Sequence, residues 1–312
     1  MTGSLLDKSL VYVTGKGGVG KTTVAAAIGL ASAARGRRTI VCEVAHQDRV
    51  SRAFALEGVR EETEVLLERD LWAITIDPEA ALREWLSGQL GGPTVRLLAH
   101  SHAFQYFVAA APGAKELVTI GKVWELAQAQ RWDRHNTAIY DTVVVDAPAS
   151  GHGLAMLTTP RTFGEIARVG PIRRQAFKIR DMLADPARTG YVAVALPEEM
   201  PVTETLELED RLPSAVGTGL DAIIVNAVYP DRFSKAEAEK LRAAADNGHR
   251  PEAAGALRAA LTEYERARSQ RSHLRRLRRE ASAPVLTLPY LFEPRVGLDE
   301  WRRLGKELER KL

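Results

Sequence analysis

Residues 15–22 constrain the fold of this chain more than any other stretch, because two glycines five positions apart are followed directly by Lys21 and Thr22. The apolar run 10–13 precedes them as an expected strand, and the alanine-rich run 24–28 follows as an expected helix. Glycines here let backbone N–H groups and the helix N-terminus face a polyphosphate. The pattern therefore predicts a phosphate loop in which Lys21 reaches the β- and γ-phosphates and the Thr22 hydroxyl binds Mg²⁺.

Seven short, almost continuously apolar segments are expected to be buried strands, and stretches that favour helix separate them. The segments are 10–13, 39–43, 71–76, 142–146, 191–196, 222–226 and 285–288. Strands of this kind are typical of a sheet that is covered by helices on both faces. The predicted fold class is therefore α/β, with a mostly parallel twisted sheet, as in the P-loop NTPases.

The whole chain, 1–312, is expected to form one domain of this kind. Two stretches, about 80–135 and 160–185, contain more helix than a crossover between strands needs. We expect them to form an inserted helical subdomain above the carboxyl ends of the strands, where ligands and partners bind in such sheets.

Composition narrows the class of protein. Hydrophobic residues make up 45% and charged residues 27%, the balance of an ordinary globular chain, and a net charge of +3 gives no reason to expect nucleic acid as a partner. Cys42 is the only cysteine, so a disulfide framework within the chain is excluded. No run has the length of a signal peptide or a membrane span, so we expect a cytoplasmic protein.

The lysine after the first glycine gives the loop an unusual form. The loop reads Gly15-Lys16-Gly17-Gly18-Val19-Gly20-Lys21-Thr22-Thr23. It resembles the deviant Walker A motif of the MinD/ParA and arsenite-pump ATPase superclass. The resemblance implies that the loop binds ATP or ADP with Mg²⁺, and that Lys16 crosses a dimer interface to the phosphates of the partner's nucleotide. Lys16 and Lys21 are then both catalytic residues.

Asp146 ends the fourth predicted strand, where a carboxylate can hold Mg²⁺ through a bound water. Pro148, Gly151 and His152 follow it in a pattern that resembles the switch II motif Asp-Thr-Ala-Pro-Thr-Gly-His, although the proline stands one place earlier. This motif belongs to the ArsA-type family, which includes arsenite-pump ATPases and the ATPase that targets tail-anchored membrane proteins.

Other segments carry the same resemblance over nearly the whole chain. Residues 112–116 resemble the family's Pro-Gly-x-x-Glu helix start, and 77–81 resemble its Ile-Asp-Pro-x-x-Ala. Asn226 closes the sixth strand as the family's adenine-binding Asn does, and the loop Pro289-Tyr290-Leu291 resembles the segment that wraps the adenine. The arginine- and alanine-rich composition adds the expectation of a bacterial member.

The chain departs from the family at switch I. The family has Asp-Pro-Ala-His, in which the Asp orients or deprotonates the attacking water, whereas this chain has Glu43-Val44-Ala45-His46. Glu43 keeps a catalytic carboxylate on a longer arm, and Asp48 is an alternative for the same role. Because catalysis depends on sub-ångström positioning, we expect ATP hydrolysis to be slow.

Three functions remain open from the sequence. The first is a dimeric, Mg²⁺-dependent ATPase switch, paired with itself or a paralogue, which controls a protein client on the helical subdomain. The second is a MinD/ParA-type ATPase that regulates membrane or nucleoid association. The third is an ATP-binding subunit with weak activity. Arsenite and tail-anchored roles lack their supporting residues, because the chain has one Cys and four scattered Met.

Two basic segments bear on the second function. Seven arginines lie within 266–279, either as a solvated face partly neutralised by nearby glutamates or as a surface for an anionic partner such as lipid. The apolar residues of the last helix, from Leu298 to Leu312, are three or four positions apart. That helix either packs on its own sheet or makes a peripheral contact with an anionic membrane.

Overall fold

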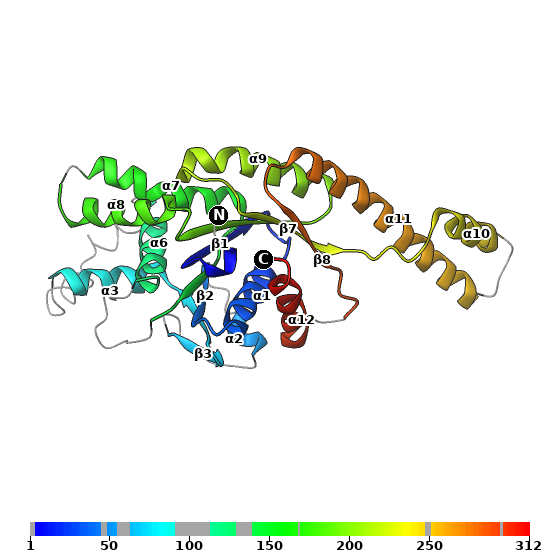
Figure 1. Ribbon diagram of the computed structural model, residues 1–312, viewed down its shortest axis with the longest axis horizontal. Helices are drawn as coiled ribbons and strands as arrows, with labels where there is room; N and C mark the ends of the chain where they lie inside the picture. The colour runs from blue at the N-terminus through cyan, green and yellow to red at the C-terminus, as the bar shows by residue number, and fades with distance from the viewer. Residues whose placement is uncertain are drawn as a thin grey trace.

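The computed structural model describes residues 4–44, 49–54, 63–90, 113–128, 139–167, 169–246, 251–293 and 296–312. The described chain contains an eight-stranded sheet in the order β3-β4-β2-β5-β1-β6-β7-β8 (Figure 1). Neighbouring strands are parallel except for β3 and β4. The strands are β1 (Leu10–Gly15), β2 (Thr39–Val44), β3 (Val65–Glu68), β4 (Leu71–Ile76), β5 (Thr142–Asp146), β6 (Thr189–Ala195), β7 (Ala222–Val228) and β8 (Val285–Pro289).

Both faces of the sheet are covered by helices. These are α1 (Lys21–Ala34), α2 (Arg49–Ala53), α3 (Pro78–Leu90), α6 (Ala114–Leu126), α7 (Ser150–Ile166), α8 (Pro171–Ala184), α9 (Glu199–Val216), α10 (Lys235–Asp246), α11 (Pro251–Glu280) and α12 (Leu298–Glu309). Leu10 and Tyr12 of β1 belong to the core with α6–α9 and α11, whereas Val11 and Val13 belong to the core with α1 and α12. Apolar side chains on both sides of one strand explain why the predicted strands are continuous apolar runs.

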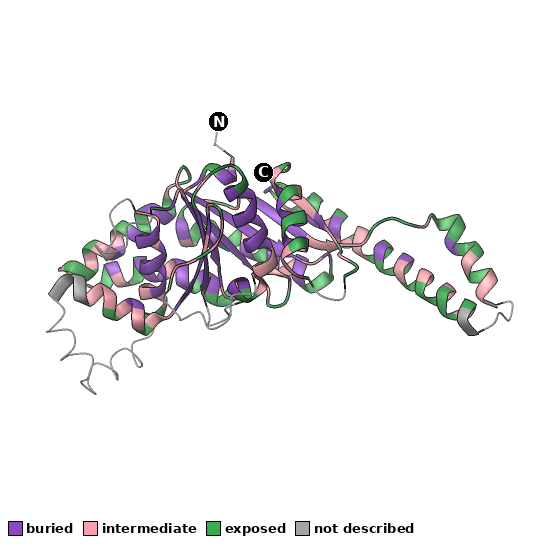
Figure 2. Cartoon of the chain, turned by 90° about the horizontal axis from the view of Figure 1, so that it is seen from below, coloured by how far each residue is buried: buried purple, intermediate pink, exposed green. Residues whose placement is uncertain are grey.

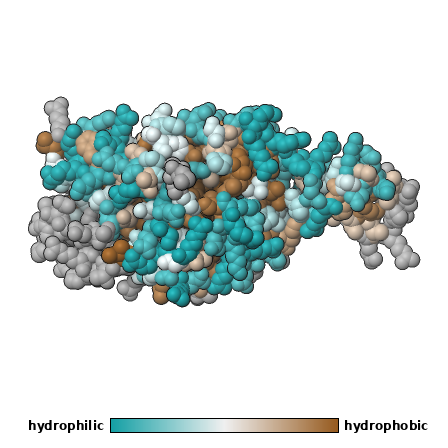
Figure 3. Space-filling view, viewed as in Figure 1, coloured by the Kyte–Doolittle hydropathy of each residue, from teal (hydrophilic) through white to brown (hydrophobic). Residues whose placement is uncertain are grey.

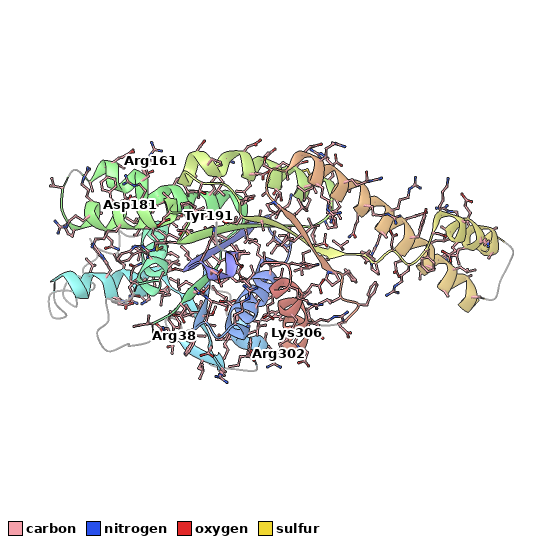
Figure 4. The ribbon with its side chains drawn as sticks, viewed as in Figure 1. Arg38, Arg161, Asp181, Tyr191, Arg302 and Lys306 are labelled. Atoms are coloured by element: carbon pink, nitrogen blue, oxygen red, sulfur yellow. The ribbon has the colours of Figure 1, made fainter. Side chains whose placement is uncertain are left out.

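The predicted α/β fold class is confirmed, and each of the seven predicted strands is present. Among the strands of the described residues, the sequence missed the antiparallel edge strand β3, which is four residues long. Leu66 of β3 is 56% exposed, so the strand lacks the buried apolar run that marks the others. Its Glu68 is paired with Arg302 of α12, 2.7 Å between Oε2 and Nη2 (Figure 4). A contact between residues so far apart in the chain cannot be recognised from a local pattern.

The last helix packs on the first. Trp301, Leu304 and Leu308 of α12 are buried in the core that α1 shares with the sheet. A Cβ at Gly305 would lie 3.1 Å from the backbone oxygen of Ala27, so the two helices approach closely at this position. Of the two interpretations of this helix, the structure shows the one in which it closes its own sheet.

A group of helices lies at one end of the molecule. There α6 packs against α3, α7 and α8 (Figure 1). The predicted helical subdomain, about 80–135 and 160–185, falls partly on 91–112, 129–138 and 168, which lie outside the described residues. Its extent therefore stays a prediction.

A second helical extension, at the opposite end, was not predicted. Helices α10 and α11 form a hairpin between β7 and β8 that projects beyond the sheet, and Figure 2 shows that its outer part is mostly exposed or half-buried. The inner part of α11 buries Leu274 and Leu277 on the sheet, as their spacing predicts. Several of its arginines are paired with carboxylates, which agrees with a solvated face. The pairs of α11 arginines are Arg271–Asp231, Arg276–Glu280 and Arg279–Glu280, and Arg242 of α10 is paired with Glu265 of α11.

Candidate nucleotide-binding site

The sheet brings the predicted site residues to one edge. Val13 of β1 pairs with Asp146 of β5, and Asp146 pairs with Glu43 of β2. On the other side of β1, β6 and β7 run parallel to it, and Asn226 lies near the same ends of these strands. The predicted phosphate, metal and adenine residues therefore share the carboxyl edge of the sheet.

Packing explains two glycines of the phosphate loop (15–22). Gly15 has φ +144°, and a Cβ there would lie 2.2 Å from the backbone oxygen of Val194. Gly20 has φ +91°, and its Cβ would lie 2.3 Å from Nδ2 of Asn226. At Gly17, by contrast, a Cβ would meet no atom within 4 Å. Protein packing does not require a glycine at Gly17, which fits a loop whose backbone is approached by a ligand.

Thr22 and Asp146 form the candidate metal site. The Thr22 hydroxyl donates a hydrogen bond of 2.6 Å to Oδ2 of Asp146, which is 7% exposed. Burial raises the pKa of Asp146, while the Thr22 hydrogen bond and the charges of Lys21 and Arg49 act in the opposite direction. A hydroxyl beside a carboxylate supplies the oxygen ligands that Mg²⁺ prefers, so these residues fit that ion. Among the described residues, no cluster of three or more His, Cys, Asp or Glu side chains offers another metal site.

Lys21 is positioned by its own loop. Its ammonium group donates a hydrogen bond of 3.0 Å to the backbone oxygen of Lys16. Burial lowers the pKa of Lys21, Asp146 raises it, and Arg49 lowers it further. An ammonium group that is partly removed from water interacts strongly with a phosphate, because little hydration has to be displaced.

Lys16 forms an ion pair within its own chain. Its Nζ lies 2.5 Å from Oε1 of Glu204 on α9, and both side chains are about one-third exposed, 34% and 29%. Glu204 was not among the predicted site residues. No local motif links positions so far apart in the chain, and only the parallel order of β1 and β6 brings α9 beside the loop.

Glu43 has a structural role in this conformation. It is 1% exposed, and its two carboxylate oxygens accept hydrogen bonds from the backbone N–H groups of Arg49, 2.9 Å, and Val50, 3.1 Å. The carboxylate therefore caps the N-terminus of α2. Ala45, His46 and the alternative Asp48 lie outside the described residues. The catalytic role of Glu43 stays a prediction.

The switch II residues lie at the start of α7. Ala147 N–H donates to the Val13 oxygen, 3.0 Å, and the Tyr12 hydroxyl donates to the Gly153 oxygen, 2.9 Å. These bonds attach both sides of the segment to β1. Between them Pro148 is half-buried, whereas Gly151 and His152 are exposed. The segment is therefore anchored at its ends, and its exposed residues lie on the first turn of the helix.

Asn226 contacts the phosphate loop. Its Nδ2 donates a hydrogen bond of 3.0 Å to the backbone oxygen of Val19. The next residue, Ala227, has φ +56°, which is unusual for a residue with a Cβ. Gln270 of α11 stabilises this turn, because its Nε2 donates to the Ala227 oxygen, 3.2 Å, and its Oε1 accepts from Tyr229 N–H, 2.8 Å. Gln270 is a second residue that sequence analysis missed.

The predicted adenine loop follows β8. Tyr290 N–H donates to the Val228 oxygen, 2.8 Å, so the loop continues the sheet edge beside Asn226. The Tyr290 ring stacks on Tyr229 with centroids 4.4 Å apart. Leu291 packs against the core on the α1 face, and Pro289 ends β8. Stacked aromatic rings at this edge offer a flat apolar surface of the kind that a purine base contacts.

Comparisons with known proteins were decisive for the family. The model of the anion-transporting ATPase family, ArsA_ATPase, matches residues 8–176 and 170–249, which is more than half of the chain. The chain belongs to this family.

Two relatives illustrate the range of this ATPase family. The ATPase BagA of Mycobacterium tuberculosis (strain ATCC 25618 / H37Rv) is 32% identical over 226 residues, 71% of this chain and 65% of BagA, so the match spans just under two thirds of that relative. The ATPase GET3 of Kluyveromyces lactis is 27% identical over 266 residues, 74% of this chain and 75% of GET3. The predicted ArsA-type ATPase family is therefore confirmed, and an ATPase family implies a nucleotide site.

The family match ends before α11, β8 and α12. Gln270 and the predicted adenine loop thus lie in the part of the chain beyond it, whereas the phosphate loop, Asp146 and Asn226 lie within it. No helix in the described part of the chain combines the length and apolar content needed to cross a membrane.

Proposed function

We propose that this chain is a Mg²⁺-dependent ATPase that works as a dimeric switch in the cytoplasm. The observation that carries the proposal is the Thr22–Asp146 hydrogen bond of 2.6 Å beside Lys21, at the end of the phosphate loop. Thr22 would hold Mg²⁺ directly and Asp146 would hold it through a water. When bound, Mg²⁺ neutralises charge on the phosphate oxygens and orients them. Lys21 and the loop N–H groups bind and position the β- and γ-phosphates.

The dimer is proposed from Lys16. In the single chain Lys16 is paired with Glu204 rather than with a residue of the phosphate site. An ion pair whose side chains are about one-third exposed contributes only about 0–1 kcal/mol, so a partner's nucleotide can compete for the lysine. The proposed partner is a second copy of the chain or a paralogue, and Lys16 then stabilises the charge on the partner's phosphates.

The client is proposed to bind at the helical end. A cavity of about 680 Å³, its open mouth included, lies between α3, α6, α7 and α8. Its lining is almost entirely apolar and includes Leu117, Phe163 and Ile179. Because α7 begins at switch II, a change at Gly151 and His152 can be transmitted along this helix to the cavity.

A second candidate, an ATP-binding subunit with weak activity, is favoured by Glu43. Both of its carboxylate oxygens accept hydrogen bonds from N–H groups of α2 and the side chain is 1% exposed, so in this conformation the carboxylate supports α2 and is shielded from solvent. The MinD/ParA-type alternative receives less support, because the apolar face of α12 is buried and three arginines of α11 (Arg271, Arg276 and Arg279) are paired with carboxylates.

A subunit-mixing experiment tests the proposed dimer. Lys16→Ala should retain ATP binding but lose about a hundredfold in turnover, as when one preorganised donor is removed. Adding excess Lys21→Ala protein should restore part of the activity, because the site with intact Lys21 then receives Lys16 from its partner. Mass-tagged co-purification checks that subunits exchange. If they exchange and turnover stays at the level of the separate variants, the crossing lysine is wrong.

The turnover and the ATP affinity of the unmodified protein separate the two candidates. Turnover that is very low in the unmodified protein, together with tight ATP binding, would favour the weakly active subunit. The variant Glu43→Gln tests whether the carboxylate is catalytic. Its amide keeps one acceptor for the N–H groups of α2 but cannot take a proton from water. An unchanged turnover in this variant would exclude Glu43 as the catalytic carboxylate.

A further inference from the structure

The turn between α7 and α8 carries an exposed apolar cluster. Ile166 is 71% exposed, Val169 is 85% exposed and Ile172 is 42% exposed. They fall within seven positions of one another. The described chain has one other such group, Tyr290, Phe292 and Val296, in which the two aromatic rings contact each other. Figure 3 shows a hydrophobic patch at this end, where α7 meets α8. Clustered apolar side chains that the fold does not bury indicate an interaction surface.

Basic side chains surround this cluster, which we call the α7–α8 tip (Ile166, Val169 and Ile172). Residues 161–167 and 169–181 contain five basic and two acidic side chains. The acidic ones, Glu165 and Asp181, are already paired with neighbouring arginines on the same helices. The unpaired charges of this surface belong to Arg173, Arg174 and Lys178, none of which has a carboxylate partner among the described residues.

We propose that the α7–α8 tip docks onto the surface of an anionic lipid bilayer. Apolar side chains at the end of a helical hairpin can enter the headgroup region, and nearby arginines and lysines attract anionic headgroups. A purely apolar peptide would need the exposed cluster but not the unpaired cations beside it. Charge complementarity therefore selects a bilayer with anionic lipids over an uncharged partner.

The location of the tip suits this role. It lies at the end of the molecule opposite the α10–α11 hairpin (Figure 1), so the projecting hairpin does not hinder its approach to a flat surface. Ile166 and Val169 do not line the apolar cavity proposed for the client. Ile172 does line that cavity, so only Ile166 and Val169 are changed in the test.

Vesicle co-sedimentation tests the proposal on the full chain. The probes are vesicles of phosphatidylcholine alone and vesicles in which about a third of the lipid is phosphatidylglycerol. The unmodified protein should bind the anionic vesicles at least about fivefold better, and the difference should shrink as salt is raised. The double variant Ile166→Asp/Val169→Asp should lose binding to both. Arg174→Glu/Lys178→Glu should lose only the part that depends on anionic lipid.

Two matched controls define what the result means. Leu66→Asp changes another exposed apolar residue, 56% exposed and on β3, and should bind vesicles as the unmodified protein does. Arg275→Glu/Arg278→Glu reverses two exposed charges on α11 and should also leave binding unchanged. Thermal melts confirm that each variant folds. Lys21→Ala should keep its vesicle binding, so failure of the ATPase proposal and failure of this one remain distinguishable.

Several outcomes would overturn the proposal. They are equal binding to both vesicle types, no binding to either, and an α7–α8 tip variant that binds like the unmodified protein. If the protein self-associates through the tip and binds no vesicle, the tip is an interface between copies of the chain. A loss of binding in the α11 variant as large as in the α8 variant would assign the membrane contact to α11.

Discussion

The two halves of the candidate nucleotide site are built differently. On the phosphate side, Thr22 and Asp146 contact each other directly, and Lys21 bonds the backbone of its own loop. On the adenine side, Asn226 depends on a turn with a positive φ at Ala227, which Gln270 stabilises from α11. The phosphate side is thus a local motif on buried strands, whereas the adenine side is assembled from distant segments.

Gly20 connects the two sides. It belongs to the phosphate loop, yet the atom nearest to its missing Cβ is Nδ2 of Asn226. The comparison therefore predicts large, specific effects on the phosphate side, smaller and more distributed effects on the adenine side, and a shared effect at Gly20. The four predictions below test these differences.

Lys21→Ala should have the largest effect. The change removes the charge that is proposed to meet the β- and γ-phosphates, so turnover should fall by more than about a thousandfold and Mg·ATP affinity should fall strongly. Phosphate release and titration with a fluorescent ATP analogue measure both quantities. Lys16→Ala is the matched control for a lost loop charge and should retain ATP affinity. Normal turnover with micromolar affinity in Lys21→Ala would refute the phosphate-loop assignment.

Asp146→Asn should lower turnover but raise the melting temperature. Turnover should fall about 10- to 100-fold, as for other changes to an indirect metal partner. Burial raises the pKa of Asp146, so the charged carboxylate is less favourable in the folded than in the unfolded chain. The free energy of unfolding therefore falls as pH rises through the folded pKa. The variant should therefore melt at a higher temperature than the unmodified protein at pH 7, by about 2 °C for each ~1 kcal/mol relieved.

The pH dependence provides the check on Asp146. Below about pH 3 the acid is mostly protonated in both the folded and the unfolded chain, so the difference in melting temperature should disappear. Melting scans of both proteins from acid to neutral pH measure this. A variant that is less stable than the unmodified protein at pH 7 would contradict the assigned direction of the pKa shift.

Gly20→Ala should weaken binding of every nucleotide by about tenfold or more. A Cβ at φ +91° is strained by about 1–2 kcal/mol, and it also displaces the Asn226 side chain, which lies 2.3 Å away. The matched control is Gly217→Ala, because Gly217 has φ +84° with no atom within 4 Å of its Cβ position. Equal losses of melting temperature in the two variants, with unchanged ATP affinity, would show that Gly20 does not link the two sides.

Asn226→Ala should have the smallest effect. It should weaken all purine nucleotides, and ATP more than the others. Loss of the hydrogen bond to Val19 loosens the phosphate loop, which should weaken GTP and ITP by about fivefold, or ~1 kcal/mol. ATP should lose more, because the amide can also pair with the adenine edge. Calorimetric titration with each nucleotide separates the contribution of the loop hydrogen bond from that of the adenine contact. An equal loss for all purines would limit Asn226 to supporting the loop.

The placement of the phosphate-side residues at one sheet edge could be predicted from sequence because the pattern that marks them is local. The glycines, Lys21 and Thr22 are consecutive, and Asp146 is recognisable as the polar end of a buried apolar strand. Parallel pairing then brings Asp146 beside β1 without any further information. The strands were found for the same reason, since each is an apolar run.

Residues that act through tertiary packing could not be predicted in this way. Glu204 and Gln270 lie on ordinary amphipathic helices, and only the placement of α9 and α11 brings them to the loop and to Ala227. The interaction of Glu43 with the N-terminus of α2 was equally invisible, because it depends on where a five-residue helix begins. The exposed α7–α8 tip was missed because exposure is a property of the folded chain.

The α10–α11 hairpin gives the molecule a lever. Helix α11 has 30 residues, so it is about 45 Å long, and Gln270 lies roughly 28 Å from its first residue. A rotation of about 5° around Gln270 would displace the outer end by roughly 2.5 Å, while the side chain that holds Ala227 would barely shift. A displacement of the outer end would thus reach the adenine side as a small rotation of the helix about Gln270. Conversely, a slight rearrangement around a bound base would be amplified into a movement large enough for another macromolecule to detect.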